Sequence, residues 1–201
     1  MLSLGGAAPL TFRRLAACEL DCVTRLEFAA DQVERFLGPI PDIIETVRHG
    51  QSHQMIGIEE GGELVGFFAI HPDRRDHTCW WLGWFGIDRR RQGGGRGARA
   101  VAAIMTRLRQ LASCREVRLF VAPENEAALR LYRRAGFVLH EVARRTGELV
   151  MRCILPPRRP SGEVPARFWA NAILMQVVAA RTCRMGVPVA AQLHGEVAFP
   201  P

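Results

Sequence analysis

The middle of the chain carries a glycine-rich loop between two runs of different periodicity. Residues 80–87 before the loop are aromatic and apolar, as in a buried strand, and residues 98–111 after it place their apolar side chains at helical spacing. Gly93–Gly95 and Gly97 lie between the two runs. A loop without side chains lets a ligand approach the backbone, and its N–H groups join the unpaired N–H groups of the first helical turn. The order of strand, glycine loop and helix therefore predicts a site for a ligand that carries phosphates.

The loop differs from two common phosphate-binding loops. A P-loop requires G-x-x-x-x-G-K-[ST], and this chain contains no lysine. A Rossmann loop follows the first strand and has an acidic ribose partner about 20 residues later. Glu116 lies near that distance, but several strand-like runs precede the loop. The loop instead fits the pattern Q-x-x-G-x-G, through Gln92, Gly95 and Gly97.

A second motif follows about 30 residues later, after an alternating strand-like run at 117–121. Residues 125–137 fit N-x-x-A-x-x-L-Y-x-x-x-G-F at every named position. Asn125, Ala128, Leu131 and Tyr132 share or border one face of a helix, and Gly136 ends that helix. Because both motifs occur in this order, chance is a poor explanation for either match.

The two motifs together resemble those of the GCN5-related N-acetyltransferase (GNAT) superfamily. Within it, the sequence of residues 83–93 and 146–148 is similar to that of the bacterial diamine and spermidine acetyltransferases. The resemblance implies an α/β fold with a mixed α+β sheet. That sheet would be central and mostly antiparallel, with about six to seven strands, splayed between the fourth and fifth strands and flanked by about four helices.

The resemblance also implies a cofactor, acetyl-CoA, and a set of site residues. The glycine loop would grip the pyrophosphate through Gln92, Gly93, Gly94, Gly95, Arg96, Gly97 and Ala98. The backbone at Phe85 and Ile87 would bind the pantetheine arm and the acetyl carbonyl. Asn125 would contact the cofactor, and Tyr132, the single tyrosine of the chain, would touch the cofactor and donate a proton to the leaving thiolate as the catalytic acid.

The rest of the chain has the order of strands and helices that such a fold requires. We expect strands at 10–14, 55–59, 63–70, 80–87, 117–121, 137–143 and 148–154, and helices at 18–26, 41–49, 98–111 and in the second motif. The GNAT domain would occupy residues 1–155. Residues 156–201 begin with a Pro/Arg-rich linker and form a tail in which 165–185 can make one helix. That tail would be loosely docked, packed on the domain or on a second subunit of a homodimer, or bound at a membrane surface.

Composition and residue spacing indicate the cellular compartment in which the protein works. No run reaches the length of a membrane-spanning helix, the start lacks the order of a signal peptide, and six cysteines show no C-x-x-C spacing. These features predict free thiols and a cytoplasmic location. His49 and His53 are four residues apart, but Gly50 interrupts the helix between them, so no metal site is expected.

The formal charge of +7 raises the question of an anionic partner. Five arginines at positions 89, 90, 91, 96 and 99 cluster at the glycine loop. They would contact the cofactor phosphates or face solvent, and a nucleic-acid partner is not favoured because no helix-turn-helix or aromatic-basic platform accompanies them.

Acetyl transfer to an amine needs a neutral nucleophile and a path for its proton. The fourth expected strand carries no carboxylate, so the general base is open among Glu59, Glu60, His71, Asp73, His77 and Glu148.

The sequence leaves the acceptor amine open as well. A polyamine, another small amine such as an amino acid or amino sugar, and a protein amine all fit, and Trp80, Trp81 and Trp84 would serve either as core residues or as cation–π faces. The predicted function is acetyl-CoA-dependent N-acetylation of a primary amine on a small molecule by direct transfer. The alternatives are a non-catalytic CoA-binding module for sensing or interaction, and acetylation of a protein or of aminoacyl-tRNA.

Overall fold

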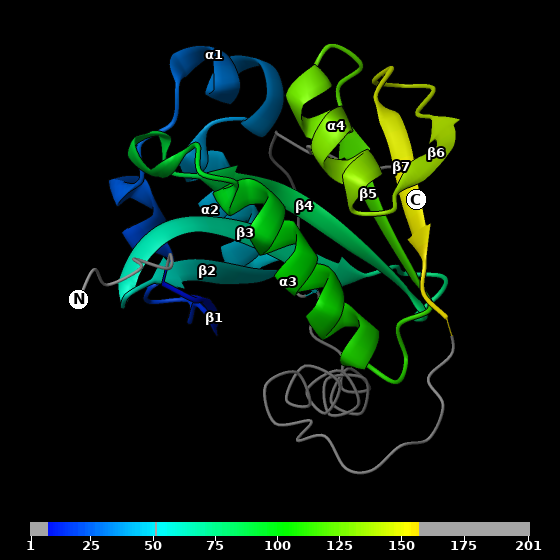
Figure 1. Ribbon diagram of the computed structural model, residues 1–201, viewed down its shortest axis with the longest axis horizontal. Helices are drawn as coiled ribbons and strands as arrows, with labels where there is room; N and C mark the ends of the chain where they lie inside the picture. Colours follow the sequence, from blue (N-terminus) through cyan, green and yellow to red (C-terminus); the bar gives the residue numbers. More distant parts are fainter. Residues whose placement is uncertain (1–7, 51, 157–201) are drawn as a thin grey trace, which may run out of the picture. The chain divides into compact units, whose positions relative to one another are not determined.

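The computed structural model describes residues 8–50 and 52–156. Within these residues the chain forms one seven-stranded sheet with the order β1-β2-β3-β4-β5-β7-β6 (Figure 1). The strands are β1 (Leu10–Arg14), β2 (Gln54–Glu60), β3 (Glu63–Pro72), β4 (Cys79–Ile87), β5 (Glu116–Val121), β6 (Val138–Val142) and β7 (Leu149–Ile154). The seven predicted strands are therefore present. The predictions for a tail helix at 165–185 and for the linker beyond residue 156 lie outside the described residues.

Six neighbouring pairs hold the sheet together, and five of them are antiparallel. The exception is β4 with β5, which run parallel and pair only from Cys79–Trp81 to Glu116–Arg118. From residue 82 onward β4 has no strand partner on this side within the described chain. We call residues 82–87 the splayed edge of β4. The prediction of a mostly antiparallel sheet that opens between the fourth and fifth strands is confirmed.

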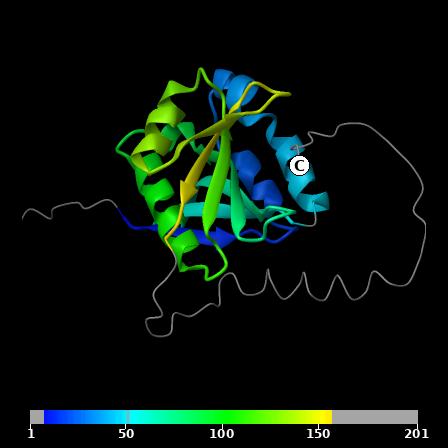
Figure 2. The same cartoon turned by 90° about the vertical axis from the view of Figure 1, so that its right-hand side faces the viewer.

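Helices cover both faces of the sheet. Figures 1 and 2 show α3 (Arg96–Gln110) and α4 (Glu126–Arg134) on one face, and α1 (Ala30–Gln32) with α2 (Ile40–His49) on the opposite face. A short 3-10 turn at Arg89–Arg91, η3, joins β4 to the glycine loop before α3. The described residues form four α-helices, the number that the family resemblance implied, although the short α1 is not among the helices expected from the sequence.

The helix predicted at 18–26 is only partly correct. The chain forms a six-residue 3-10 helix there, η1 (Leu20–Arg25), and Leu26 returns to an extended conformation. Its buried residues, Leu20 and Val23, are three apart, which suits the three-residue turn of a 3-10 helix. A further helical segment, α1 followed by the π-helical turn η2 (Val33–Leu37), was not predicted; it ends at Gly38, whose φ is 82°.

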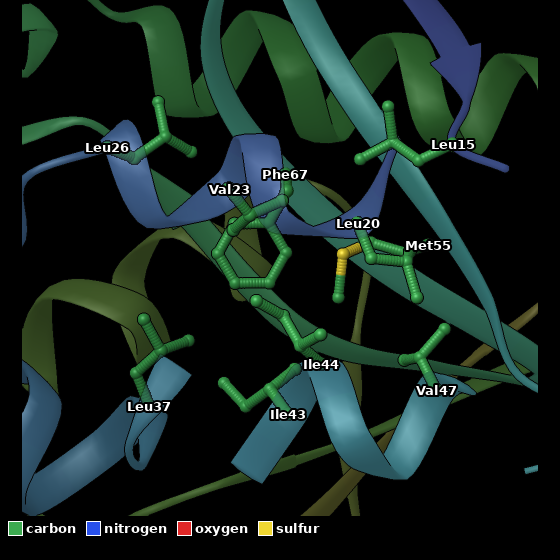
Figure 3. Packing of buried hydrophobic residues seen from close by; sticks show 10 residues of the cluster. All are labelled: Leu15, Leu20, Val23, Leu26, Leu37, Ile43, Ile44, Val47, Met55 and Phe67. Carbon is green, nitrogen blue, oxygen red and sulfur yellow. The ribbon is translucent and has the colours of Figure 1, made fainter. Parts of the chain in front are cut away.

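The face that carries α1 and α2 has its own hydrophobic cluster (Figure 3). Ile43, Ile44 and Val47 of α2 pack with Met55 of β2 and Phe67 of β3. The remaining members are Leu15, Leu20, Val23, Leu26 and Leu37. Because side chains alternate along a strand, every second residue of β3 after Phe67 faces this same layer. This alternation determines on which side of the sheet the β3 residues of the candidate site lie.

Candidate active site

The glycine loop adopts a backbone that other residues avoid. Gly93, Gly94 and Gly95 have φ values of 83°, 56° and 72°. A Cβ atom at Gly93 or Gly95 would meet nothing within 4 Å, so the dihedral angle and not crowding requires glycine at these positions. Gly95 is the N-cap of α3, and no side chain of the described residues caps this helix. The N–H of Arg96 reaches the carbonyl of Gly93 at 3.3 Å, and the next N–H groups of the first turn stay available for an anion.

A buried carboxylate fixes the chain between β4 and the loop. Asp88 is 2% exposed and accepts hydrogen bonds from the backbone N–H of Arg90 at 2.8 Å and from that of Glu27 at 3.3 Å. The Arg90 guanidinium donates to the same carboxylate at 2.7 Å and holds the pKa of Asp88 below its ordinary value. Asp88 thereby joins the end of β4 to the segment after η1. This anchor was not predicted, because an isolated aspartate after a strand carries no distinctive sequence pattern.

The side chain of Gln92 is also used inside the protein. Its Nε2 atom donates to the carbonyl of Ile87 at 3.0 Å and to Oε1 of Gln32 at 3.2 Å. Gln92 thus ties the loop to β4 and to α1. Its predicted contact with the cofactor remains a prediction.

Ion pairs tie the arginines of the loop to the β2–β3 hairpin. Nε of Arg96 and Nη2 of Arg99 each lie 2.8 Å from one oxygen of Glu60, and Arg91 pairs with Glu63. Hydrogen bonds from Arg96 and then Arg99 hold the pKa of Glu60 below its ordinary value. These guanidinium groups therefore stand beside the uncapped end of α3 in fixed positions.

Arg90 and Arg89 differ in their ion pairing. Arg90 contacts Glu27 at 3.3 Å as well as Asp88, whereas Arg89 makes no ion pair with any residue in the described ranges. Of the five clustered arginines, Arg89 is therefore the one whose guanidinium is least occupied by ion pairs within the described chain.

The splayed edge of β4 contains a bulge. Gly83 pairs with Ala69 and Gly86 pairs with Phe67, so β4 has one residue more than β3 over this stretch. Trp84 takes up the extra residue with a φ of 45°, the one positive φ among the non-glycine residues of the described chain. Within the described residues, the backbone groups of this edge that point away from β3 have no strand partner, although the Ile87 carbonyl accepts the side chain of Gln92. An extended ligand arm can hydrogen-bond to the remaining groups, as the expectation for the backbone at Phe85 and Ile87 requires.

The second motif forms α4 as expected. Asn125 caps the helix, since its Oδ1 accepts the N–H of Ala128 at 3.1 Å. Tyr132 is 7% exposed, and its ring packs edge-to-face on Phe137 at 5.8 Å. Burial raises the pKa of Tyr132 above its ordinary value. Its hydroxyl therefore stays protonated at neutral pH and can donate a proton; its role, like the cofactor contact of Asn125, remains a prediction.

A row of rings lies on the α2 side of the sheet, and we call these five residues the ring row. Trp81 stacks on Phe120 with centroids 4.8 Å apart and planes at 12°, and on His71 at 6.5 Å and 13°. His71 lies 4.3 Å from His53, and His53 lies 5.6 Å from Trp84. The sequence indicated the tryptophans and His71 separately but not the row. Its members come from β5, β4, β3 and the segment before β2, and only the β3–β4 register pairs His71 with Trp81.

Three of the candidate bases are carboxylates that already have partners within the protein. Glu59 forms an ion pair with Arg13 at 3.0 Å, and Glu60 is held by two arginines. Asp73 accepts the indole N–H of Trp81 at 2.9 Å as well as backbone N–H groups of its own turn. Each of these carboxylates already accepts hydrogen bonds from guanidinium or N–H groups of the protein.

The other three candidates lie in different surroundings. His77 is exposed in the β3–β4 turn, and Glu148 is half-buried at the β6–β7 hairpin. His71 lies within the ring row, on the strand next to β4. Burial lowers the pKa of His71 below its ordinary value, and burial together with the nearby charges of His71 and Arg74 lowers the pKa of His53 to about 4. Both imidazoles are neutral at pH 7.

We found no metal-binding arrangement in the part of the chain that the structure describes. No group of three or more His, Cys, Asp or Glu side chains in residues 8–50 and 52–156 can hold an ion. His49 is exposed and contacts Glu45 at 2.9 Å, while His53 belongs to the ring row. Within the same ranges, no helix is long and apolar enough to cross a membrane.

A sheet that opens at its one parallel pair, with an uncapped helix and a left-handed glycine loop beside the opening, defines the class of the protein as an acyltransferase with a GNAT-type fold. The comparison with protein families agrees, because residues 20–137 match the Acetyltransferase (GNAT) family. The chain belongs to this family.

Individual relatives fit the same assignment. The chain is 31% identical over 113 residues to the spermine/spermidine N(1)-acetyltransferase of Bacillus subtilis strain 168, covering 54% of this chain and 74% of the relative. Among solved structures, it is similar to AAC(6')-Ib in complex with ribostamycin and coenzyme A, with a TM-score of 0.62 at 17% identity over 73% of this chain and 93% of that one. A spermidine N-acetyltransferase chimera from Vibrio cholerae and hSSAT gives a TM-score of 0.59 at 19% identity, covering 73% of this chain and 96% of that one. At these identities the structural matches show the fold alone.

Proposed function

We propose that this protein transfers an acetyl group directly from acetyl-CoA to a primary amine of a small molecule. The observation that carries this proposal is the splayed edge of β4, which has no strand partner on its β5 side within the described residues and lies before the glycine loop and the N-terminal end of α3. One continuous stretch of chain thus offers hydrogen-bonding groups for an extended amide arm and then for phosphates.

The residues present suit the parts of acetyl-CoA. Its pyrophosphate would lie on the N–H groups of Gly93–Gly95 and of the first turn of α3, where the helix dipole favours negative charge. The guanidinium groups of Arg96 and Arg99 stand beside this turn, and Arg89 is a further cation without an ion pair in the described chain. The pantetheine arm would pair with the backbone at Phe85 and Ile87, in the place of a missing strand.

When bound, acetyl-CoA supplies the thioester whose acetyl group is transferred. Backbone N–H groups of the splayed edge would stabilise negative charge on the carbonyl oxygen. Tyr132 would donate its phenolic proton to the sulfur as the C–S bond breaks, and the raised pKa of this buried hydroxyl keeps the proton in place until then. The side chain would act on the same face of the sheet as α3 and α4.

The acceptor is proposed as a small primary amine, such as a polyamine, an amino acid or an amino sugar. The name of the Bacillus subtilis relative supports a polyamine. The ring row supports an amine that stacks on flat, apolar surfaces, because indole and phenyl faces attract ammonium groups as well as apolar groups.

The test is mass spectrometry of acetylated products after the protein is mixed with acetyl-CoA and a pool of polyamines, amino acids, amino sugars and peptides. One small-molecule product that depends on the protein is the expected result. An acetylated peptide alone would move the function to protein acetylation. Binding of acetyl-CoA without any product would contradict the enzyme proposal and favour a CoA-binding module.

A further inference from the structure

Two histidines lie together in the ring row, beside the strand on which acetyl transfer is proposed to occur. The ring centroids of His53 and His71 are 4.3 Å apart, with planes inclined at 49°. His71 belongs to β3, and His53 belongs to the segment before β2. Neither ring is required to fill the hydrophobic cluster of Figure 3, which consists of aliphatic side chains and Phe67.

The pair is linked to both ends of the stretch where β4 leaves β5. His71 stacks on Trp81, the last residue of β4 that pairs with β5. His53 packs on Trp84, the residue of the bulge whose neighbour Phe85 is proposed to bind the acetyl carbonyl. His53 therefore lies beside the residue that precedes Phe85, and His71 lies against His53 at the end of the splayed edge nearer to Trp81.

The histidines lie on the side of the sheet opposite to Tyr132. His71 follows Phe67 by four residues on β3, so it faces the α1 and α2 layer. Tyr132 lies on α4, which covers the opposite face (Figure 2). In acyl transfer the amine and the leaving sulfur are separate substituents of one tetrahedral carbon, and each needs its own proton-transfer group. A base on one side of the β4 edge and an acid on the other would serve these two atoms separately.

A backbone contact determines which nitrogen of His71 can accept a proton. Nδ1 of His71 lies 3.1 Å from the carbonyl oxygen of Pro72. A carbonyl oxygen only accepts hydrogen bonds, so Nδ1 must carry the hydrogen in this contact. In a neutral imidazole the other nitrogen, Nε2, then has the lone pair.

Burial keeps the pair neutral. It opposes protonation of His71 most strongly, whereas the Pro72 carbonyl and Asp73 favour protonation and Arg74 opposes it. Burial also opposes protonation of His53 most strongly, together with the charges of His71 and Arg74. A weakly basic imidazole suits an amine that has already bonded to the acetyl carbon, because that bond makes the ammonium N–H far more acidic than in the free amine.

We propose that His71 is the general base of the acetyl transfer, that it accepts the proton through Nε2, and that His53 is a positioning residue that holds its ring. This assignment rests on the proposed function. The neutral amine nitrogen forms a bond to the thioester carbon, and one of its protons passes to Nε2 of His71. The C–S bond then breaks, Tyr132 protonates the leaving sulfur, and the proton on His71 passes to solvent and ultimately restores the tyrosine hydroxyl. No oxidant or further reactant is needed.

The first test reads the state of the imidazole without any turnover. In protein with ¹⁵N-labelled histidine, NMR identifies the protonated nitrogen of each ring, and loss of one signal set in His71→Phe assigns His71. We expect Nδ1 of His71 to be protonated and Nε2 to be unprotonated at pH 7, with and without CoA. A protonated Nε2 at pH 7 would overturn the assignment.

The second test uses the amine found in the product screen. His71→Ala should lower kcat about 100-fold or more, in the range of general-base effects, while KM for acetyl-CoA changes little. Added imidazole should restore part of kcat in His71→Ala but not in His71→Phe, where the new ring fills the space. His140→Ala, on the exposed strand β6, is the matched control and should keep the wild-type rate.

The outcomes separate the two proposals. If the wild-type protein acetylates an amine and His71→Ala is equally fast, the base assignment alone fails. If the wild-type protein binds acetyl-CoA but acetylates nothing, the proposed function fails and the base assignment fails with it. Low activity of His71→Ala that imidazole does not restore, together with a lower thermal stability than wild type, would reduce His71 to a packing role.

Discussion

His53 and His71 place their rings 4.3 Å apart although 17 residues separate them and neither belongs to a helix. Their contact exists because β2 and β3 form an antiparallel hairpin whose open end brings the start of β2 beside the end of β3. The pairing of Gln54 with Ile70 sets the two histidines just beyond the last paired residues. Burial of both rings in their neutral form makes the fold sensitive to acid.

We predict that acid destabilises the protein partly through His53. Its pKa is about 4 in the folded protein and near 6.5 when unfolded, so the unfolded chain binds more protons between these values. Stability should therefore fall as pH decreases from about 6.5 towards 4. For this half-buried ring we expect about 1–2 kcal/mol between pH 7.5 and 5, after allowance for solvent screening.

Urea unfolding of wild-type protein and His53→Phe at both pH values measures this effect. The phenylalanine variant should lose less stability at pH 5, and the exposed-site variant His140→Phe should behave as wild type. Equal losses in wild type and His53→Phe would show that His53 is not the group responsible.

We predict that Gly95→Ala weakens acetyl-CoA binding more than it destabilises the fold. Gly95 has a φ of 72° with open space around it, so alanine costs about 1–2 kcal/mol of left-handed strain or a changed loop. The matched control is Gly147→Ala in the β6–β7 hairpin, with a φ of 75° and equally open space. Both variants should lose similar thermal stability, but calorimetry should show at least about a tenfold weaker Kd for acetyl-CoA, worth 1.4 kcal/mol, only in Gly95→Ala. Equal Kd values would remove the loop from the cofactor site.

Most of the fold could be predicted from the sequence because its elements have clear periodicity. β2, expected at 55–59, is found at Gln54–Glu60, and α3, expected at 98–111, is found at Arg96–Gln110. The segments that differed are short. η1 was expected to be a full helix, and α1 with η2 was not expected, because in fewer than ten residues the local spacing does not distinguish one type of turn from another.

The site could be predicted only where it is contiguous in the sequence. The glycine loop and the helix with Asn125 and Tyr132 each form one uninterrupted motif. The ring row could not be predicted, because it depends on strand register. The ion pairs of Glu60 with Arg96 and Arg99 could not be predicted either, since they join residues 36 and 39 positions apart.

We predict that Glu60→Gln strengthens acetyl-CoA binding at low salt. The carboxylate of Glu60 neutralises Arg96 and Arg99 beside the first turn of α3. Glutamine can still accept hydrogen bonds from them but leaves both positive charges for the phosphates. Kd should fall several-fold at about 0.02 M salt, and the gain should shrink at about 0.5 M salt, where charges are screened within a few ångströms.

The neighbouring variant Glu59→Gln is the control for this experiment, since Glu59 pairs with Arg13 and not with the loop. It should leave Kd unchanged at both salt concentrations. Weaker binding by Glu60→Gln would instead mean that the ion pairs are needed to hold the loop in its binding conformation.

Finally, we predict that Tyr132→Phe lowers kcat about 100-fold while the KM for acetyl-CoA stays within about twofold, since a general acid acts only in the transition state. Phenylalanine keeps the edge-to-face packing on Phe137, so thermal stability should stay close to wild type. Tyr132→Leu is the comparison, because it removes both the hydroxyl and the ring packing and should lower kcat and stability together. The pKa of Tyr132 is raised by burial, so the wild-type rate should show no alkaline loss from this group below pH 10. A Tyr132→Phe protein with unchanged kcat would exclude the hydroxyl from the reaction and leave the thiolate to be protonated by water.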